Sequence, residues 1–567
     1  MARRRAFAIL FLALIAAYPA LMRTTKRMQR ERKTDVRPDA KKALTPTVPG
    51  ERGVAQQWMQ KMTLRDRIAQ LVIITSYGEA PSSRSAAYRD YVRAVRDLKV
   101  GGMIVVNRVV GGAVRNAEPY AMAAFLNRMQ RLATVPLMVG GDFERGASMR
   151  VSGTPKYPHQ MAYGAARDFT LTRNLGLATA REARALGVHW VFAPVADVNN
   201  NPDNPIINIR SFGENPTDVA GQVRAFIEGA HSDPANRVLV TVKHFPGHGD
   251  TATDSHMGLA SLTANRERMQ AVELAPFREA VATGVDAVMT AHMAAPAYEP
   301  EEIPATVSEK VLTGLLRQEL AFGGLIVTDA MDMQGLTKQF PGGEAAVRAL
   351  EAGADVLLMP PDPEAAIKAV LAAVKEGRLT SKRINESVMR VLAAKARVGL
   401  HKNRLVNLER ISETIDSPES EEQAQLAADR AVTLLKNENW VLPLQNTAGA
   451  CVWVLAEGRY GQQGRRFEDE VRSRAPNARL HHFDQQVSLT EMEQALAKAG
   501  QCEAHVVAAY VTVAAYRGNV ALTGNYPAFL EKLQGTGSPV ALAALGNPYL
   551  LRGFPWVNAY LATFSTA

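Results

Sequence analysis

The sequence predicts an α/β fold, in which a (β/α)8 barrel of the TIM type is followed by a smaller α/β sandwich domain. Two observations point to the barrel. From residue 68 onward, short apolar runs of strand length alternate with longer amphipathic stretches, and polar or ionisable residues gather at the ends of several runs. Most of these runs lack polar alternation, which is typical of parallel strands covered on both faces.

The composition is that of a globular protein. Of the 567 residues, 47% are hydrophobic and 22% are charged, which argues against wholesale disorder and against a polytopic membrane protein. The formal net charge is +10, but residues 1–42 contain twelve Lys and Arg against three acidic residues and so carry most of it. Because the remainder is nearly neutral, we expect no nucleic-acid partner. With only two cysteines, a disulfide-rich scaffold and a cysteine-based zinc site are excluded.

The N-terminal segment has the pattern of a targeting sequence. Arg3, Arg4 and Arg5 precede an uncharged, mostly apolar run over residues 6–22, which is typical of a secretory signal and just long enough for a membrane anchor. We interpret residues 1–50 as a signal peptide or membrane anchor plus a flexible lead-in. We therefore expect a periplasmic or other extracytoplasmic protein, with membrane association through residues 6–22 if the segment is kept. A cytoplasmic protein with a later start is the alternative.

The predicted barrel domain covers residues 51–400. Helix-like patterns lie between its strands, for example at 171–186, 264–283 and 308–320. Eight strand–helix alternations within roughly 300 residues fit a barrel better than an open doubly wound sheet. The eight runs are QLVIIT (70–75), GGMIVV (101–106), PLMVGGD (136–142), WVFAPVADV (190–198), RVLVTVKHF (237–245), DAVMTAHM (286–293), GLIVTDAM (324–331) and ADVLLMP (354–360).

Polar side chains at the ends of five runs predict an enzyme. In a barrel the carboxyl ends of all strands open onto one face, where catalytic residues collect. Any single one of these residues also has a structural explanation, and Asp197 in particular has the alternative role of a helix cap. Five runs that end in this way are hard to explain by capping alone. The residues are Asp142, Asp197, Lys243 with His244, His292, and Asp329.

The segment KHFPGHGDTATDSH, residues 243–256, is the densest in chemistry-bearing side chains. Two of its histidines are four residues apart, but the proline and glycines around them disfavour the helix that would align them on a metal, and no phosphate-binding glycine motif is present. We therefore expect neither a metal nor a cofactor. Lys243 and His244 are expected at a strand end, and a glycine-rich loop then carries Asp254 and His256 into a polar pocket. A carboxylate two residues from an imidazole can orient it as a general acid or base.

This segment resembles the signature of glycoside hydrolase family 3, and in particular of its bacterial β-N-acetylglucosaminidase branch, which acts in peptidoglycan turnover. The resemblance covers residues 55–400 as the barrel domain, and AADRAVTLLKNENWVLPL (427–444) resembles the opening of the family's C-terminal α/β sandwich domain. Six further segments agree in order along the chain: GGDFERGASMR (140–150), FAPVADVN (192–199), RSFGENP (210–216), MTAHMAAP (289–296), PATVS (304–308) and VTDAMDMQG (327–335).

The resemblance implies a role for eight residues. Asp329 matches the nucleophile that attacks the anomeric carbon, His256 matches the acid/base, and Asp254 completes an Asp–His dyad in place of the usual second carboxylate. The chain departs from the family's acidic motif after the third strand, where Phe143 and Arg145 replace the usual residues. The groups that match those holding the sugar hydroxyls and the N-acetyl group are Asp142, Arg150, Arg210, Lys243 and His244.

The leading functional hypothesis is a retaining exo-β-N-acetylglucosaminidase that removes terminal β-linked N-acetylglucosamine through a covalent glycosyl-enzyme. Its expected partner is an oligosaccharide or muropeptide substrate. A β-glucosidase or β-xylosidase of the same superfamily is an alternative that the Asp-Ser-His element argues against, and a phosphorolytic N-acetylglucosaminidase is another. A non-catalytic binding module would require Asp329 and His256 to be idle.

Three other polar residues near these segments have structural interpretations. His292 is either a buried, hydrogen-bonded histidine or a substrate contact. His248, which is flanked by glycines, is expected to support the loop, and Asp332 is expected to cap the helix that follows it.

The C-terminal part is expected to hold a linker at 401–425 and the sandwich domain at 426–567. CVWVLAEG (451–458), HVVAAYVT (505–512) and VALAALGNP (540–548) predict strands of an open α/β sheet. Compared with the family pattern the domain ends early at Ala567, which leaves its completeness open. Cys451 and Cys502 are expected to be free core thiols, although export would permit a disulfide.

Overall fold

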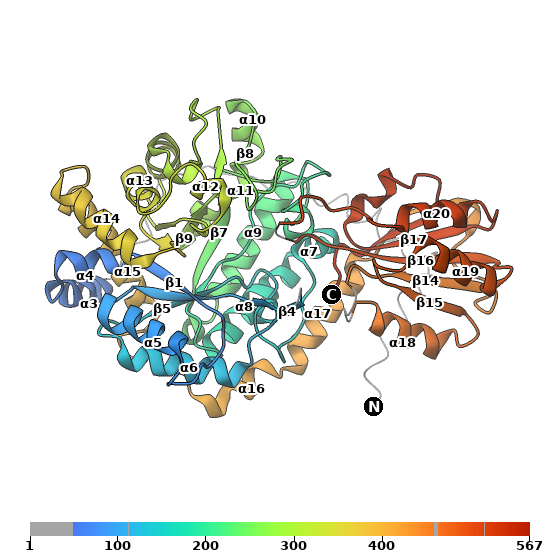
Figure 1. The fold of residues 1–567 in the computed structure, drawn as a ribbon, viewed down its shortest axis with the longest axis horizontal. Helices are drawn as coiled ribbons and strands as arrows, with labels where there is room; N and C mark the ends of the chain where they lie inside the picture. The colour runs from blue at the N-terminus through green and yellow to red at the C-terminus, as the bar shows by residue number, and fades with distance from the viewer. Residues whose placement is uncertain (1–48, 111–112, 459–462, 515) are drawn as a thin grey trace. The chain divides into compact units, whose positions relative to one another are not determined.

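The structure, a computed structural model, describes residues 49–110, 113–458, 463–514 and 516–567 (Figure 1). The described residues form two compact units. The barrel unit extends to Ala424 and also includes Ala514–Gly518, and the sheet unit comprises Gln425–Val513 and Asn519–Ala567. The predicted signal or anchor run over residues 6–22 lies outside the described residues. Within the described part of the chain, no helix combines the length and the apolar character needed to span a bilayer.

The barrel unit contains eight parallel strands in chain order. Each of the eight predicted apolar runs overlaps one of them, so the predicted fold class is confirmed. A parallel bridge between Val327 and Val356 joins the last two strands and closes the sheet. The strands are β1 (Val72–Ser76), β2 (Gly102–Val105), β5 (Met138–Gly141), β6 (Trp190–Val191), β7 (Leu239–Phe245), β9 (Ala287–Thr290), β11 (Leu325–Val327) and β12 (Leu357–Leu358).

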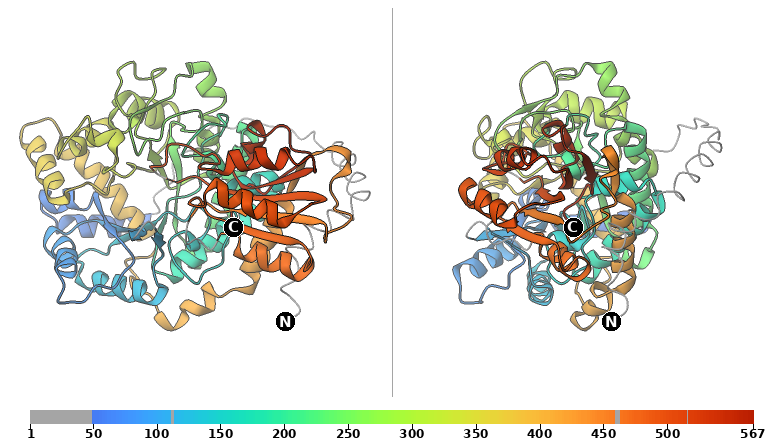
Figure 2. Two further views of the ribbon diagram at one scale, coloured as in Figure 1. Left: turned by 45° about the vertical axis from the view of Figure 1, so that its right-hand side comes forward. Right: turned by 90° about the vertical axis from the view of Figure 1, so that its right-hand side faces the viewer.

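Helices lie around the outside of these strands, as the turned views also show (Figure 2). Asp168, Asn215 and Asp362 cap three of them by accepting backbone N–H groups of the first turn, and a proline follows the cap in the last two cases. The helices of the unit are α3 (Pro49–Gln60), α4 (Leu64–Ala69), α5 (Ala86–Val92), η1 (Arg93–Leu98), α6 (Pro119–Leu132), α7 (Gln160–Ala166), α8 (Phe169–Ala185), α9 (Pro216–His231), α10 (Arg266–Ala271), α11 (Ala275–Thr283), η6 (Lys310–Glu319), α12 (Gln334–Thr337), α13 (Glu344–Ala352), α14 (Pro363–Lys375), α15 (Ser381–Arg397) and α16 (Ile411–Ile415).

Two predicted helices differ in detail from the structure. The pattern at 264–283 forms two helices, α10 and α11, because Pro276 lies in the first turn of α11 and has no backbone N–H with which to continue the preceding helix. The pattern at 308–320 forms the π-helical segment η6. Two short strand pairs of the barrel unit form sheets separate from the eight-stranded one: β3 (Arg108–Val110) pairs with β4 (Ala113–Arg115), and β8 (Ala260–Ser261) pairs with β10 (Met293–Ala294).

The sheet unit is an open six-stranded sheet with helices on both faces. All pairs are parallel except the edge pair β13–β18. Trp453 and Phe529 belong to the core between the sheet and helices α19 and α20, whereas Phe467 of α18 packs against the opposite face. The elements are β13 (Thr433–Asn437), β14 (Ala450–Leu455), α18 (Arg465–Arg474), β15 (Arg479–Phe483), α19 (Leu489–Ala499), β16 (Ala504–Val511), α20 (Tyr526–Gln534), β17 (Val540–Gly546) and β18 (Ala559–Ala562); α17 (Pro418–Ala431) contains the division between the units.

The expectation of two free thiols is wrong, because Cys451 and Cys502 form a disulfide. Cys451 lies on β14, and Cys502 lies just before β16. These two strands are hydrogen-bonded neighbours, so their cysteines come within 5.8 Å between Cα atoms although 51 residues separate them in sequence. A sequence pattern cannot show this proximity, which depends on the order of strands in the sheet.

Buried ionisable groups at the amino ends of the barrel strands differ in whether an opposite charge lies beside them. Asp286, just before β9, pairs with His231, Arg237 and Arg397. Lys395 of α15 differs, because its side chain is fully buried and donates to the neutral Gln70 Oε1 at 2.7 Å. Burial lowers the pKa of Lys395 from its usual 10.5 to about 7. The barrel therefore contains an ammonium group whose charge opposes folding.

We predict that Lys395→Met raises the free energy of unfolding most at or below neutral pH. Lys395 has a lower pKa in the folded than in the unfolded chain, so the unfolded chain binds more protons between about pH 7 and 10 and the wild type gains stability as pH rises. The stability difference between variant and wild type should thus be about 3 kcal/mol larger at pH 7 than at pH 9.5. Urea unfolding at both pH values measures it. Lys368→Met, at an exposed position of α14, is the matched control; a difference that does not change with pH would contradict the prediction.

Candidate active site

The carboxyl ends of five barrel strands supply the polar residues that the sequence singles out. Asp142 directly follows β5, Lys243 and His244 come immediately before the last residue of β7, and Asp329 lies two residues after β11. Because the strands are parallel and neighbouring, these ends meet at one rim of the barrel.

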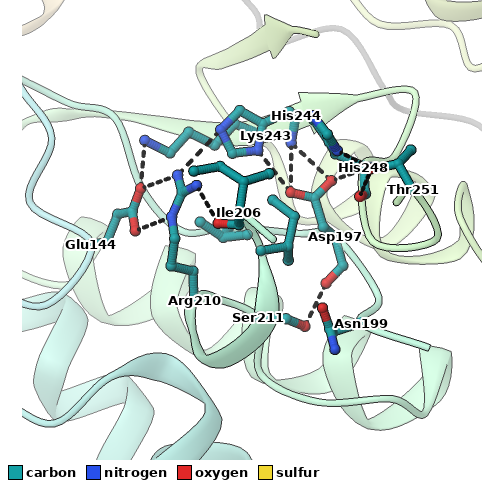
Figure 3. A network of polar contacts seen from close by, with 12 residues as sticks. Glu144, Asp197, Asn199, Ile206, Arg210, Ser211, Lys243, His244, His248 and Thr251 are labelled. Carbon is teal, nitrogen blue, oxygen red and sulfur yellow. Dashed lines mark hydrogen bonds and ion pairs between the residues drawn. The ribbon is translucent and has the colours of Figure 1, made fainter. Parts of the chain in front are cut away.

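A cluster of buried and half-buried charged side chains occupies this rim, and Figure 3 shows three of its members, Glu144, Lys243 and Arg210. Lys243 Nζ lies 2.8 Å from both Asp142 Oδ1 and Glu144 Oε1. Arg150 Nη2 donates to Asp142 Oδ2 at 2.9 Å, and Arg210 donates to both oxygens of Glu144 at 3.0 and 2.7 Å. One ammonium group therefore links two carboxylates, and a guanidinium holds each carboxylate from its other side.

The cluster keeps its members ionised. Burial alone would raise the pKa of Asp142, but Lys243 and Arg150 lower it to about 2. Burial alone would likewise lower the pKa of Lys243, but the carboxylates of Asp142 and Glu144 raise it above its usual value. Arg210 and Lys243 outweigh burial at Glu144 and hold its pKa well below the usual range. The cluster thus presents fixed charges and hydrogen-bonding groups to a polar molecule at the rim.

Asp197 positions two histidines beside this cluster (Figure 3). Its Oδ2 lies 2.7 Å from His244 Nδ1, and its Oδ1 accepts the backbone N–H of His248 at 2.7 Å. With Nδ1 engaged, the other nitrogen of His244 lies 3.4 Å from Arg210 Nη2. His248 is buried, and its Nδ1 lies 2.6 Å from Thr251 Oγ1. This contact joins two residues of the same loop, so His248 supports the loop.

Glycines allow the loop after β7 to pack tightly on the barrel. Gly247 has φ +126°, a conformation that L side chains rarely adopt. A Cβ on Gly249 would lie only 1.8 Å from the carbonyl oxygen of Val198. The Gly-His-Gly pattern of the sequence therefore reflects the close approach of this loop to the chain that follows β6.

The same loop carries Asp254 and His256 as a bonded pair. His256 Nδ1 lies 2.8 Å from Asp254 Oδ1, which also accepts the backbone N–H of His256 at 2.9 Å. Burial alone would raise the pKa of Asp254, but the hydrogen bonds from His256, followed by one from the backbone of Tyr516, lower it. An ionised Asp254 fixes the ring so that its other nitrogen, Nε2, points away from this carboxylate.

Asp329 is surrounded by imidazoles. Its Oδ1 accepts the backbone N–H of Ala330 at 2.8 Å. Burial alone would raise its pKa, but three neighbouring imidazoles lower it below the usual value. A half-buried carboxylate that remains ionised is suited to act as a nucleophile. The three histidines are His244, His292 and His256.

His292 is fully buried and bonded at both ring nitrogens. Nε2 lies 3.0 Å from the carbonyl oxygen of Ala330, and Nδ1 lies 2.8 Å from Thr306 Oγ1. Burial lowers the pKa of His292. These contacts fit the first of its two interpretations, a hydrogen-bonded histidine that supports the backbone next to Asp329.

All eight sequence-predicted site residues take part in the contacts described above. Two members of the arrangement, Glu144 and Asp197, were not predicted as site residues. Glu144 lies two residues beyond Asp142 in the acidic motif of residues 140–150, and this position is its signal in the sequence. Asp197 was among the strand-end acids, but the alternative of a helix cap concealed its role in holding His244 and His248. Asn107, whose Oδ1 accepts from Arg150 Nη1 at 2.6 Å, also gave no signal in the sequence.

This combination of features defines a class of protein. A closed parallel barrel carries at its carboxyl rim an ionised carboxylate, an imidazole bonded to a second carboxylate, and a cluster able to bind a polyhydroxy compound; barrel glycosidases are built from such parts. The chain belongs to glycosyl hydrolase family 3. The family's N-terminal domain matches residues 63–394.

Individual relatives agree with this assignment. The chain is 31% identical over 388 residues to a β-N-acetylglucosaminidase/β-glucosidase of Cellulomonas fimi and 34% identical over 378 residues to β-hexosaminidase A of Pseudoalteromonas piscicida. These matches cover 67% and 60% of the chain but only 65% and 61% of the relatives, so less than two thirds of either relative is matched. Among solved structures, the family 3 β-N-acetylglucosaminidase of Paenibacillus sp. str. FPU-7 is similar, with a TM-score of 0.77, 33% identity, and coverage of 89% of this chain and 94% of that one.

Proposed function

We propose that the protein is a retaining exo-β-N-acetylglucosaminidase that removes terminal β-linked N-acetylglucosamine through a covalent glycosyl-enzyme. The observation that carries the proposal is the Asp254–His256 pair next to the half-buried, ionised Asp329. A retaining glycosidase needs a nucleophile on one face of the sugar and a proton donor on the other. The names of the two curated relatives and of the similar solved structure support the choice of sugar.

In the first step the Asp329 carboxylate attacks the anomeric carbon. The bond to the glycosidic oxygen breaks, and this oxygen leaves with the bonding electrons and takes a proton from His256 Nε2. In the second step the neutral imidazole removes a proton from water, whose oxygen attacks the anomeric carbon and releases the Asp329 carboxylate. Asp254 orients the imidazole and stabilises its cation in both steps.

The charged cluster holds the sugar during both steps. Asp142 and Glu144 offer acceptors, and Arg150, Arg210 and Lys243 offer donors, all fixed before the substrate arrives. His244 is fixed by Asp197 and lies next to this cluster. Because His244 also lowers the pKa of Asp329, it is close enough to the nucleophile to contact the sugar near the reacting carbon. Groups fixed in advance need no reorganisation when charge develops in the transition state.

As the natural substrate we propose fragments of peptidoglycan, which contain β-linked N-acetylglucosamine at non-reducing ends. This choice rests on the resemblance of the 243–256 segment to the family branch that acts in peptidoglycan turnover.

We also propose that the protein acts outside the cytoplasm. The apolar run at residues 6–22 after three arginines supports export, and so does the Cys451–Cys502 disulfide, because disulfides persist in oxidising compartments. The same run would serve as a membrane anchor if it is not removed.

We predict that the protein is located outside the cytoplasm. Cell fractionation, combined with alkylation of free cysteine thiols, tests this location. The protein should appear in the periplasmic, extracellular or membrane fraction, with both cysteines protected from alkylation until a reductant is added. Recovery from the cytosol alone, with both thiols reactive, would contradict the proposal.

Asp329→Ala should lower the rate of hydrolysis about 10⁴-fold or more, because it removes the group that forms the covalent intermediate. A fluorinated N-acetylglucosamine-type inactivator should esterify Asp329 in the wild type, which peptide mass spectrometry with fragmentation locates. Asp332→Ala, three residues away, is the matched control and should retain the label on Asp329. Labelling at another residue, or near-normal turnover by Asp329→Ala, would refute the assignment.

His256→Ala should slow hydrolysis of a disaccharide or muropeptide by roughly 10²–10⁴-fold, because a sugar alkoxide needs a proton in order to leave. Cleavage of an activated nitrophenyl N-acetylglucosaminide should suffer far less, since nitrophenolate departs almost unaided. Breakdown of the glycosyl-enzyme then becomes slow, so a burst should appear and azide should accelerate turnover. Asp254→Asn should show a milder form of the same pattern.

The same assay separates the alternatives. Equal losses on both substrate types, without a burst or an azide effect, would make His256 a binding residue. Parallel assays of aryl N-acetylglucosaminide and aryl glucoside, each with and without phosphate, distinguish the proposed hydrolase from a glucosidase and from a phosphorylase.

A further inference from the structure

A short segment that is distant in sequence contacts the Asp254–His256 pair. Residues Ala514–Gly518 group with the barrel unit, although the sequence on both sides belongs to the sheet unit. The backbone N–H of Tyr516 donates to Asp254 Oδ2 at 2.9 Å. Because Oδ1 is already used by His256, both oxygens of this carboxylate are occupied. The segment therefore helps to fix the dyad.

The side chain of Tyr516 lies beside the imidazole. The rings of Tyr516 and His256 are edge to face, with centroids 5.2 Å apart and an interplanar angle of 65°. The tyrosine is nevertheless 60% exposed, and its φ of +66° is uncommon for a residue with a side chain. An exposed aromatic ring that the backbone holds in a strained conformation against a proposed catalytic group calls for a functional explanation.

A second exposed apolar side chain belongs to the residue that follows this histidine. Met257 directly follows His256 and is 45% exposed. Its backbone carbonyl accepts from Lys338 Nζ at 2.9 Å, which ties the loop to the residue after α12. A Cβ on Gly518 would lie 3.6 Å from Met257 Sδ, so the methionine and the Tyr516 segment are neighbours. The Tyr516 ring therefore lies beside His256, and the Met257 side chain lies beside the segment that carries this ring.

We propose that Tyr516 and Met257 form the subsite for the leaving group, and that this subsite binds a ring with an apolar face, either a pyranose or an aryl group. The proposal rests on the proposed function. A proton donor must reach the glycosidic oxygen, so the group beyond that oxygen lies against whatever flanks the donor. The hydrogen-bonding cluster around Lys243 is suited to the polar sugar that is released after hydrolysis. The apolar pair of Tyr516 and Met257 is suited to the C–H face of the group that departs.

The experiment compares two substrates that carry the same N-acetylglucosamine but different leaving groups. N,N′-diacetylchitobiose has a sugar that would contact Tyr516, whereas the leaving group of β-N-acetylglucosaminyl fluoride is a single atom that cannot. Tyr516→Asn removes the ring, keeps the backbone N–H that contacts Asp254, and suits the left-handed backbone conformation. The ratio of kcat/KM for the disaccharide to kcat/KM for the fluoride should fall about tenfold. Met257→Ser should lower the same ratio by a smaller factor.

Two further variants make the result specific. Tyr516→Phe keeps the ring and should retain the wild-type ratio. Trp440→Asn is the matched control, because Trp440 is also an exposed aromatic residue with a positive φ, of 57°, but lies in the sheet unit. Its ratio should equal that of the wild type.

The outcomes separate this inference from the proposed function. An unchanged ratio in Tyr516→Asn, with both substrates still hydrolysed, would overturn the subsite alone. A wild-type protein that cleaves neither substrate would refute the proposed function instead. An equal loss on both substrates in Tyr516→Asn would mean that the ring acts on the shared N-acetylglucosamine and not on the leaving group, and this result would overturn the subsite. A lower ratio accompanied by a burst and by azide acceleration on the nitrophenyl substrate, the pattern expected for Asp254→Asn, would mean that the ring only supports the dyad, and this result would also overturn the subsite.

Discussion

The closed parallel sheet is the constraint on which the rest of the site depends. Parallel pairing around the whole circle, completed by the bridge between Val327 and Val356, brings every strand carboxyl end to the same rim. Charged residues at that rim are buried by their neighbours, and an isolated buried charge is costly. Lys243 can therefore remain an ammonium group, with only 3% of its side chain exposed, because Asp142 and Glu144 both contact it. The opposite charges within this cluster therefore offset the cost of burying Lys243 in the folded barrel.

The two ends of the barrel use buried charge differently. At the amino ends, Asp286 and Asp355 are each held by several cationic side chains and bond to the backbone of adjacent strands, an arrangement that fixes strands and helices together. At the carboxyl ends the ion-paired side chains present their polar atoms at the rim of the barrel. Three histidines at this rim lower the pKa of Asp329. Lys395, buried beside a neutral partner, shows how large the effect of desolvation is without a compensating charge.

The proposed acid/base lies on a loop, whereas the proposed nucleophile lies only two residues after a strand. Asp329 is thus fixed by the barrel itself, and His256 depends on contacts from several directions. Asp254 holds the ring, Tyr516 holds Asp254, and the carbonyl oxygen next to His256 accepts from Lys338. A group that must donate a proton in one step and accept one in the next is well served by an orientation that hydrogen bonds, and not the strand backbone, determine.

The sequence by itself determined the eight strands, their order and the residues at their ends, because parallel strands buried on both faces leave continuous apolar runs. It also determined the Asp254–His256 pair, whose partners are two residues apart. Only the tertiary structure decided the contacts between residues far apart in the chain. These are Glu144 with Lys243 and Arg210, Asp197 with His244, Cys451 with Cys502, and Tyr516 with Asp254. Local periodicity and spacing report which face of an element is buried, but such contacts arise from the order of strands in a sheet and from the path of loops, which no local pattern encodes.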